Sequence, residues 1–243
     1  MKPIAIIQAR MGSTRLPGKV LMDIGGRSML ARVVERTRQS KCVDGTIVAA
    51  TTNPQDEALV SECRNLAVPL FRGSEDDVLD RYYRAAIEHD ADPVVRITSD
   101  CPLLDSQVVD QVVASFVETS PDYASNVTSR TFPLGLDVEV VSREALDRAW
   151  READKSYERV HVTPYINRHP ERFRLATVSA GQDYSGYRWT VDTPEDLAFV
   201  RAVYARLGRN GRFGWRDVLA LVRREPGLIE LNRGVRQKAL EEG

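Results

Sequence analysis

Short apolar runs alternate with longer amphipathic stretches along the first half of the chain. The runs are apolar on both faces, which is typical of buried parallel strands, and the stretches repeat their apolar residues with the period of a helix. This alternation predicts an α/β fold, in which helices sandwich a single, mainly parallel, Rossmann-like sheet through right-handed crossovers. The predicted strands are 4–7, 46–50, 68–71 and 93–98, and the predicted helices are 29–39, one that starts at Asn53–Pro54, and 76–88.

The second half of the chain is less regular, but it still carries signals for individual elements. Residues 187–191 lead into a helix with Thr193 as its cap, Pro194 in its first turn and Gly208 past its end. The other predicted elements are strands at 137–141 and 173–179, a helix at 143–152, and a last helix in the tail after Arg209, with 240–243 expected to fray.

The size and charge of the chain limit its domain organisation and the partners it can attract. Its 243 residues suffice for one large domain, and no linker divides them, so we expect 1–243 to form a single domain. Lysine and arginine number 34 against 35 for aspartate and glutamate, which gives no overall attraction to nucleic acid or an anionic membrane. A phosphate site must then be a local concentration of cations.

The sequence shows no targeting or cysteine-based signal. No apolar run is long enough to span a membrane, and the N-terminal run is too short for a secretion signal, so we expect a cytoplasmic protein. Three scattered cysteines argue against a disulfide framework, and three irregularly spaced histidines argue against a zinc site.

The segment Gln8–Lys19, QARMGSTRLPGK, is the strongest functional signal. It follows the first predicted strand, and ligands of such sheets bind beyond the carboxyl ends of the strands. Its glycines allow backbone N–H groups to approach an anion, and Arg10, Arg15 and Lys19 can neutralise a triphosphate. The spacing fits neither the P-loop G-x-x-x-x-G-K-[ST] nor the dinucleotide motif G-x-G-x-x-G. We favour phosphate binding over a solvated turn whose charges bind nothing.

Two aspartates are candidate metal ligands. Asp100 follows the fourth predicted strand, where its hard oxygens suit a magnesium ion, which takes one or two carboxylates and otherwise binds substrate phosphates. Asp105, further along the same loop, fits a helix cap better. Asp192 precedes the capping Thr193, so it either belongs to the helix start or points elsewhere.

The segment I-Q-A-R-M-G-S-T-R-L-P-G-K resembles the signature of the cytidylyltransferases that make CMP-activated sugar acids. These include the Kdo and the acylneuraminate cytidylyltransferases, and the resemblance is strongest to their relatives in spore-coat polysaccharide biosynthesis. The family pattern, roughly I-x-A-R-x-x-S-x-R-x-x-x-K, is filled at every fixed position, with Gln8 where many Kdo enzymes have proline. The segment V-D-T-P-E-D-L at 191–197 also matches.

This resemblance implies a domain of the glycosyltransferase-A-like type with a small dimerisation arm, a homodimer, and a loop that wraps the phosphates of CTP. It implies that Asp100 and Asp192 bind Mg²⁺, and that Arg72 approaches the cytosine. The nucleotide-binding residues that it implies are Gln8, Ala9, Arg10, Gly12, Ser13, Lys19, Arg72 and Ser74.

The acceptor is expected to bind in the less regular part, roughly residues 122–190, which would also carry the dimer contacts. Gly135 would let a sugar approach closely. Asp137 and Glu139 would share one strand face, where they either bind hydroxyls or metal or form the wet face of an edge strand. His161 suits a packing or dimer contact equally well. The acceptor candidates are Asn126, Gly135, Asp137, Glu139 and His161.

Together these parts predict that an acceptor hydroxyl attacks the α-phosphorus of CTP and that pyrophosphate leaves. Arg10, Arg15, Lys19 and Asp100 are the predicted catalytic residues, because phosphoryl transfer depends chiefly on positioning and charge stabilisation. The acceptor would be a sugar acid or a similar small molecule. One alternative is a nucleotide-sugar-dependent glycosyltransferase, although such enzymes usually carry D-x-D and Asp100 stands alone. The other is a non-catalytic CTP-binding protein.

Overall fold

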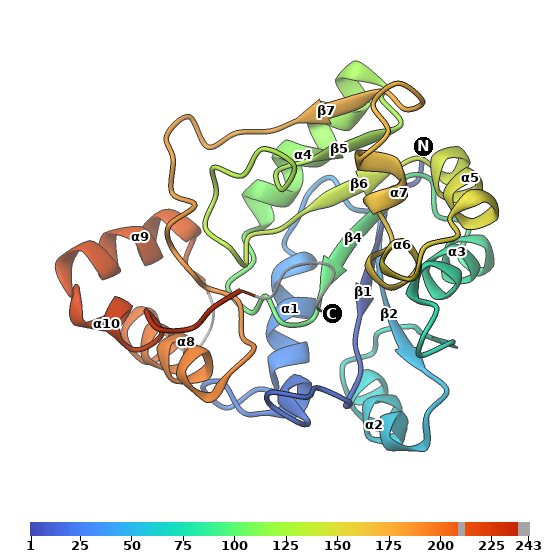
Figure 1. Ribbon diagram of the computed structural model, residues 1–243. Coiled ribbons are helices and arrows are strands. Elements are labelled where there is room, and N and C mark those ends of the chain that lie inside the picture. The colour runs from blue at the N-terminus through green and yellow to red at the C-terminus, as the bar shows by residue number, and fades with distance from the viewer. Residues whose placement is uncertain (209–211, 238–243) are drawn as a thin grey trace.

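The computed structural model describes residues 1–208 and 212–237. Within these residues the strands form one seven-stranded sheet in the order β3-β2-β1-β4-β6-β5-β7 (Figure 1). The strands are β1 (Ile4–Gln8), β2 (Gly45–Thr51), β3 (Leu70–Gly73), β4 (Val94–Thr98), β5 (Tyr123–Ser125), β6 (Glu139–Val141) and β7 (Leu175–Thr177).

The first four strands are parallel, as predicted. β1 lies between β2 and β4, with Ile6 in register with Ile47 on one side and Arg96 on the other. The carboxyl ends of β1 and β4 are therefore neighbours, and the loop after Gln8 opens beside the loop after Thr98. This register brings the cationic segment and Asp100 to one edge of the sheet.

The other end of the sheet departs from the parallel order. β6 runs antiparallel to β4 and β5, and β5 pairs in parallel with β7. The predicted strands 137–141 and 173–179 exist in shortened form as β6 and β7. β5 was missed, because three residues are too few to display a period.

Helices cover both faces of the sheet (Figure 1). Along β1, Ala5 and Ile7 contribute to one core and Ile4 and Ile6 to the other, since side chains alternate along a strand. The helices on the first face are α1 (Met29–Thr37), α2 (Glu57–Asn65), α4 (Ser106–Thr119), α8 (Pro194–Leu207), α9 (Trp215–Arg224) and α10 (Gly227–Glu230). Those on the second face are α3 (Val78–Glu88), α5 (Arg143–Glu152), α6 (Ser156–His161) and α7 (Pro164–Asn167).

Helix starts follow their capping signals closely. The Thr193 hydroxyl accepts a hydrogen bond from the Asp196 backbone N–H, and the Asp196 carboxylate accepts one from the Thr193 N–H. The start predicted at Asn53 is a short 3-10 helix, Pro54–Asp56, that precedes α2. Another short 3-10 helix, η1, spans Lys19–Leu21.

The described part of the tail carries two helices, α9 and α10, and the predicted fraying end at 240–243 lies outside the described residues. No helix in the described part of the chain has the length and apolar character needed to cross a membrane.

Candidate active site

The cationic segment after β1 is folded back on itself. The Gly18 N–H donates to the Met11 carbonyl at 3.0 Å, with Gly18 in the left-handed region at φ +69°. The Ser13 hydroxyl accepts from the Leu16 N–H at 3.3 Å. The buried Asp56 carboxylate holds the start of the loop by accepting the Met11 N–H at 2.7 Å. The loop is therefore a braced structure and not a loose turn.

Lys19 lies between the two predicted metal ligands. Its Nζ donates to Asp100 Oδ2 at 3.2 Å, to Asp192 Oδ1 at 2.9 Å and to the Val191 carbonyl at 2.7 Å. The Val191 N–H donates to the Asp100 carbonyl at 2.8 Å, which ties the segment before α8 to the loop after β4. The fold therefore joins three segments that are distant in the sequence.

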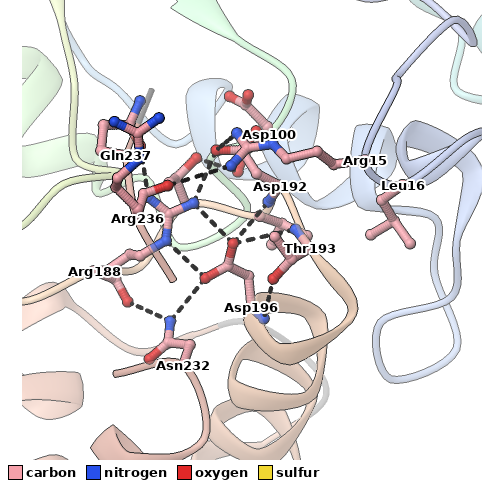
Figure 2. A network of polar contacts seen from close by, with 12 residues as sticks. Arg15, Leu16, Asp100, Arg188, Asp192, Thr193, Asp196, Asn232, Arg236 and Gln237 are labelled. Atoms are coloured by element: carbon pink, nitrogen blue, oxygen red, sulfur yellow. Dashed lines mark hydrogen bonds and ion pairs between the residues drawn. The ribbon is translucent and has the colours of Figure 1, made fainter. Parts of the chain in front are cut away.

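Of the two carboxylates, Asp192 has more cationic partners than Asp100 (Figure 2). Besides Lys19, its Oδ2 accepts from Arg188 at 2.9 Å and lies 3.0 Å from the Arg15 guanidinium. Arg15 also donates to the Arg236 carbonyl at 3.4 Å. Two of the three predicted catalytic cations thus meet the two predicted metal ligands directly.

The charges in this cluster stabilise one another. Burial alone would lower the pKa of Lys19, but Asp100 and Asp192 outweigh it and raise that pKa. Burial would raise the pKa of Asp192, but Lys19, Arg188 and Arg15 outweigh it and lower that pKa. The Asp192 contribution to stability is lost as the pH falls through its lowered pKa, and that of Lys19 is lost as the pH rises through its raised pKa. Both groups stay charged across the neutral range.

The residues fit a metal ion only in part. Among residues 1–208 and 212–237, no cluster of three or more His, Cys, Asp or Glu side chains could hold one. The two carboxylates that share Lys19 Nζ offer hard oxygen atoms, and the Asp100 side chain is 27% exposed. A pair of this kind suits magnesium that also binds substrate phosphates, and it does not suit an ion bound by the protein alone.

Arg10 stands apart from this cluster. Its side chain is 51% exposed and lies 3.7 Å from Glu75 Oε1. Glu75 also accepts from the Asn53 side chain at 2.9 Å, and it borders Gly12, where an added Cβ would lie 3.3 Å from its carboxylate. Arg10 is therefore on the β3 side of the loop, and its catalytic role stays a prediction.

The residues predicted to contact the base form hydrogen bonds with other groups of the protein. Arg72 donates to the Thr51 and Asn53 carbonyls and to Glu57. Ser74 accepts the Asp77 N–H beside the start of α3. These contacts tie the β3 loop to the loop after β2 and to the start of α3, and contact with a base remains a prediction.

Glu139, the acceptor candidate on β6, belongs to a buried polar network. Glu139 is 4% exposed, forms an ion pair with Arg96, and accepts from Tyr123 and Thr163 at 2.6 Å each. Arg96 also donates to Gln8 Oε1 at 3.2 Å, which connects this network to the end of β1.

This environment removes one of the alternatives for Glu139. β6 lies between β4 and β5, so Glu139 is not on the wet face of an edge strand. Asp137 precedes the strand and is held by both terminal nitrogens of Arg130. The fully buried Asn126 side chain donates to the Leu136 carbonyl and accepts the Val138 N–H. His161 ends α6.

The glycine at position 135 is explained by backbone packing. Its φ is +108°, and a Cβ there would lie 2.6 Å from the Thr190 nitrogen and 2.7 Å from the Trp189 carbonyl carbon. We expect Gly135→Ala to lower the free energy of unfolding by roughly 3 kcal/mol in denaturant titrations, because it adds a clash to backbone strain.

The control for Gly135→Ala is Gly181→Ala. Gly181 also has a positive φ, +79°, but its Cβ would meet nothing within 4 Å. That variant should lose only about 1 kcal/mol, the cost of the conformation itself. Equal losses at the two positions would show that the contact with Trp189 and Thr190 is unimportant.

Four site residues escaped sequence analysis: Asp56, Arg188, Asp196 and Asn232. Asp56 and Asp196 each have a local signal, since both follow a capping residue by three positions. That signal predicts helix capping and does not reveal the contacts with Met11 or Arg188. Arg188 and Asn232 show no sequence signal at all.

Comparisons with known proteins agree with this geometry. The family model described as Cytidylyltransferase matches residues 4–217. The spore coat polysaccharide biosynthesis protein SpsF of Bacillus subtilis is 34% identical over 91% of this chain and 94% of its own. A cytidylyltransferase structure from Leptospira borgpetersenii has a TM-score of 0.91 and 32% identity, covering 98% of this chain and all of that one.

A more distant structure shares the fold. A CMP:2-keto-3-deoxy-manno-octonic acid synthetase complexed with CTP has a TM-score of 0.67 at 18% identity, over 85% of this chain and all of that one. The braced cationic loop, the aspartate after β4 and the matched span from the first strand to α9 lead to one conclusion: this chain belongs to the cytidylyltransferase family.

Proposed function

We propose that this protein transfers CMP from CTP to a hydroxyl group of a sugar acid or a related acceptor, releasing pyrophosphate, as a cytoplasmic step of cell-surface polysaccharide biosynthesis. The observation that carries the proposal is the contact of Lys19 with both Asp100 and Asp192. It sets phosphate-binding cations against a pair of carboxylates at the ligand-binding edge of the sheet. The polysaccharide biosynthesis named for the Bacillus subtilis relative and the synthetase seen with CTP support the choice of pathway, nucleotide and acceptor.

In this proposal, Arg15 and Lys19 exchange partners when the nucleotide arrives. In the structure both cations contact Asp192. A triphosphate is a stronger anion than one carboxylate, so we expect both side chains to turn toward its phosphates and to neutralise the charge on the departing pyrophosphate. Arg10, on the opposite side of the loop, would approach the triphosphate from there.

Asp100 and Asp192 are then free to hold Mg²⁺. Such an ion, when bound, neutralises phosphate oxygens and lowers the pKa of a coordinated hydroxyl. The residues themselves supply the position: Asp100 at the end of β4, and Asp192 at the start of α8. Because three cations surround Asp192 beforehand, we expect the metal to bind together with CTP and only weakly without it.

Residues 122–190 supply the acceptor and dimer surfaces in this proposal. The network of Arg96, Glu139 and Gln8 connects β6 with the end of β1. We propose that Asn126, Asp137 and Glu139 shape the acceptor pocket, with His161 nearby, and that a homodimer forms through this part of a single domain. Gly135 contributes by setting the position of the Trp189–Thr190 backbone.

The test is a pyrophosphate-release screen with each of the four ribonucleoside triphosphates, Mg²⁺ and a panel of sugar acids. Release that requires CTP and an acceptor, with a CMP-linked product, supports the proposal. Transfer from a nucleotide-sugar without pyrophosphate release would instead identify a glycosyltransferase. CTP binding in calorimetry without turnover on any acceptor would identify a binding protein.

A further inference from the structure

Asp192 has three cationic partners, and Arg188 is the one outside the cationic loop. Arg15 and Lys19 belong to the cationic loop, whereas Arg188 lies four residues before Asp192 in the segment that leads into α8. In the proposed reaction the two loop cations turn to the phosphates. Arg188 is then the partner that stays with Asp192.

The Arg188 guanidinium is fixed on its other sides. Its Nε and one terminal nitrogen donate to the two oxygens of Asp196, both at 2.8 Å, and its remaining nitrogen donates to Gln237 Oε1 at 2.5 Å. The Arg188 side chain is 11% exposed and that of Asp196 is fully buried. A two-point arginine–carboxylate pair of this kind leaves the guanidinium little freedom to rotate.

Asn232 secures the pair from the C-terminal segment. Its side-chain amide donates to Asp196 Oδ1 at 2.9 Å and to the Arg188 carbonyl at 3.0 Å, and the residue is 5% exposed. Figure 2 shows Asn232, Asp196 and Arg188 directed toward one another beneath Asp192. Figure 1 shows the segment that carries Asn232 returning from α10 toward the middle of the molecule.

The Asp196 carboxylate also orients the Asp192 backbone. Asp196 Oδ2 accepts the Asp192 N–H at 3.0 Å and the Thr193 N–H at 3.2 Å. The side chain and the main chain of Asp192 are therefore both held, one through Arg188 and the other through Asp196. A helix cap needs only the second of these contacts, so capping alone does not account for Arg188 and Asn232.

We propose that Arg188 is a positioning residue for cytidylyl transfer, which it serves by holding Oδ2 of Asp192 so that Oδ1 faces the nucleotide-bound metal once Lys19 has turned away. Asn232 and Asp196 keep Arg188 in place. This inference rests on the proposed function. It assigns the C-terminal segment 232–237 a part in the reaction, through the contacts of Asn232 and Gln237 with Arg188 and Asp196.

Charge supports this division of roles. Lys19, Arg15 and Arg188 face Asp100, Asp192 and Asp196, so each of these carboxylates has a cationic partner without a ligand. When the phosphates draw away Lys19 and Arg15, those cations no longer compensate the negative charges of Asp100 and Asp192, which can then attract a divalent ion. Asp196 stays neutralised by Arg188, and the metal meets a pair of carboxylates whose geometry is already set.

The test compares Arg188→Lys with the wild-type protein. Lysine keeps the charge but cannot contact both Asp196 oxygens and Asp192 at once. With Mn²⁺ as a spin probe in the presence of CTP, we expect the dissociation constant of the metal to rise about tenfold, with a similar fall in kcat. The KM for CTP should change little, because Arg15 and Lys19 are intact.

Two further variants make the result decisive. Arg143→Lys is the matched control, because Arg143 forms an exposed ion pair with Asp90. This variant should leave the metal dissociation constant, kcat and the KM for CTP unchanged. Asn232→Ala keeps the arginine and should shift metal affinity in the same direction by a smaller factor, and it decides the matter if Arg188→Lys does not fold.

The inference is overturned if Arg188→Lys has the metal affinity and the kcat per folded molecule of the wild-type protein, even if its melting temperature falls. If Arg188→Lys does not fold, the same result in Asn232→Ala overturns it. That outcome leaves Arg188 a purely structural residue. A wild-type protein that releases no pyrophosphate would instead overturn the proposed function, while the Mn²⁺ titrations with CTP would still show whether Arg188 orients the metal ligand.

Discussion

Replacing Asp100 by asparagine should slow pyrophosphate release from CTP by about a thousandfold, which corresponds to about 4 kcal/mol of transition-state stabilisation. Asparagine keeps the shape of the side chain and removes the charge on which the metal depends. Lys19 retains its bonds to Asp192 and to the Val191 carbonyl, so the fold around the site should remain. Steady-state kinetics at saturating Mg²⁺ and CTP measure the effect.

Asp105→Asn is the control for Asp100→Asn. Asp105 lies in the same loop and accepts the Gln107 N–H and the Trp215 N–H, so it caps α4 and anchors α9. Loss of a buried acceptor should lower the free energy of unfolding by about 1–3 kcal/mol and leave kcat per folded molecule unchanged. If Asp100→Asn retained more than a tenth of the wild-type kcat, Asp100 would not be the metal ligand.

Replacing Lys19 by methionine should lower kcat for pyrophosphate release by about a hundredfold or more and raise the KM for CTP, because one charge aimed at the phosphates is lost. The change also removes the cation shared by Asp100 and Asp192, whose carboxylates then repel each other. Discounting for the partial exposure of both aspartates and for the remaining arginines, we expect a loss of about 2 kcal/mol in the free energy of unfolding.

Magnesium should distinguish this variant from the wild-type protein without any turnover. Once Lys19 is gone, a divalent ion can take its place between the two carboxylates and stabilise the folded state by mass action. Mg²⁺ should therefore raise the melting temperature of Lys19→Met and leave that of the wild-type protein nearly unchanged.

Lys2→Met is the matched control. Lys2 donates to the His89 carbonyl at an exposed position before β1, away from the ligand-binding edge of the sheet. Its variant should behave as wild type in kinetics and in the Mg²⁺ melts. A Lys19→Met protein with the Mg²⁺ response of wild type would show that Asp100 and Asp192 do not form a common metal site.

Much of this protein was predictable because its signals are local. The four buried runs became parallel strands, and the capping signals at Asn53 and Thr193 became helix starts. The cationic segment needed no distant partner to indicate a phosphate site, since its glycines and charges are adjacent in the chain. The family model that matches residues 4–217 agrees with that interpretation.

Other features arose only when distant segments met. Glu139 alternates with Asp137 in the sequence, as the side chains of an edge strand would, but the pairing of β6 between β4 and β5 buries it against Arg96. In the sequence, Gly135 looks like a glycine that lets a ligand approach the backbone closely. In the structure, the Trp189–Thr190 backbone occupies the space that a side chain at this position would need.

The sequence by itself determined the parallel half of the sheet, the cationic loop at its carboxyl edge and the two aspartates, because apolar period, capping and charge density are properties of neighbouring residues. Only the tertiary structure decided which charges meet. The contacts of Lys19 with Asp192, of Arg188 with Asp196, and of Asn232 with both residues of that pair join segments whose separation along the chain carries no pattern. Such pairings are set by the packing of α8 against the sheet and of the C-terminal segment against α8, and a sequence does not display them.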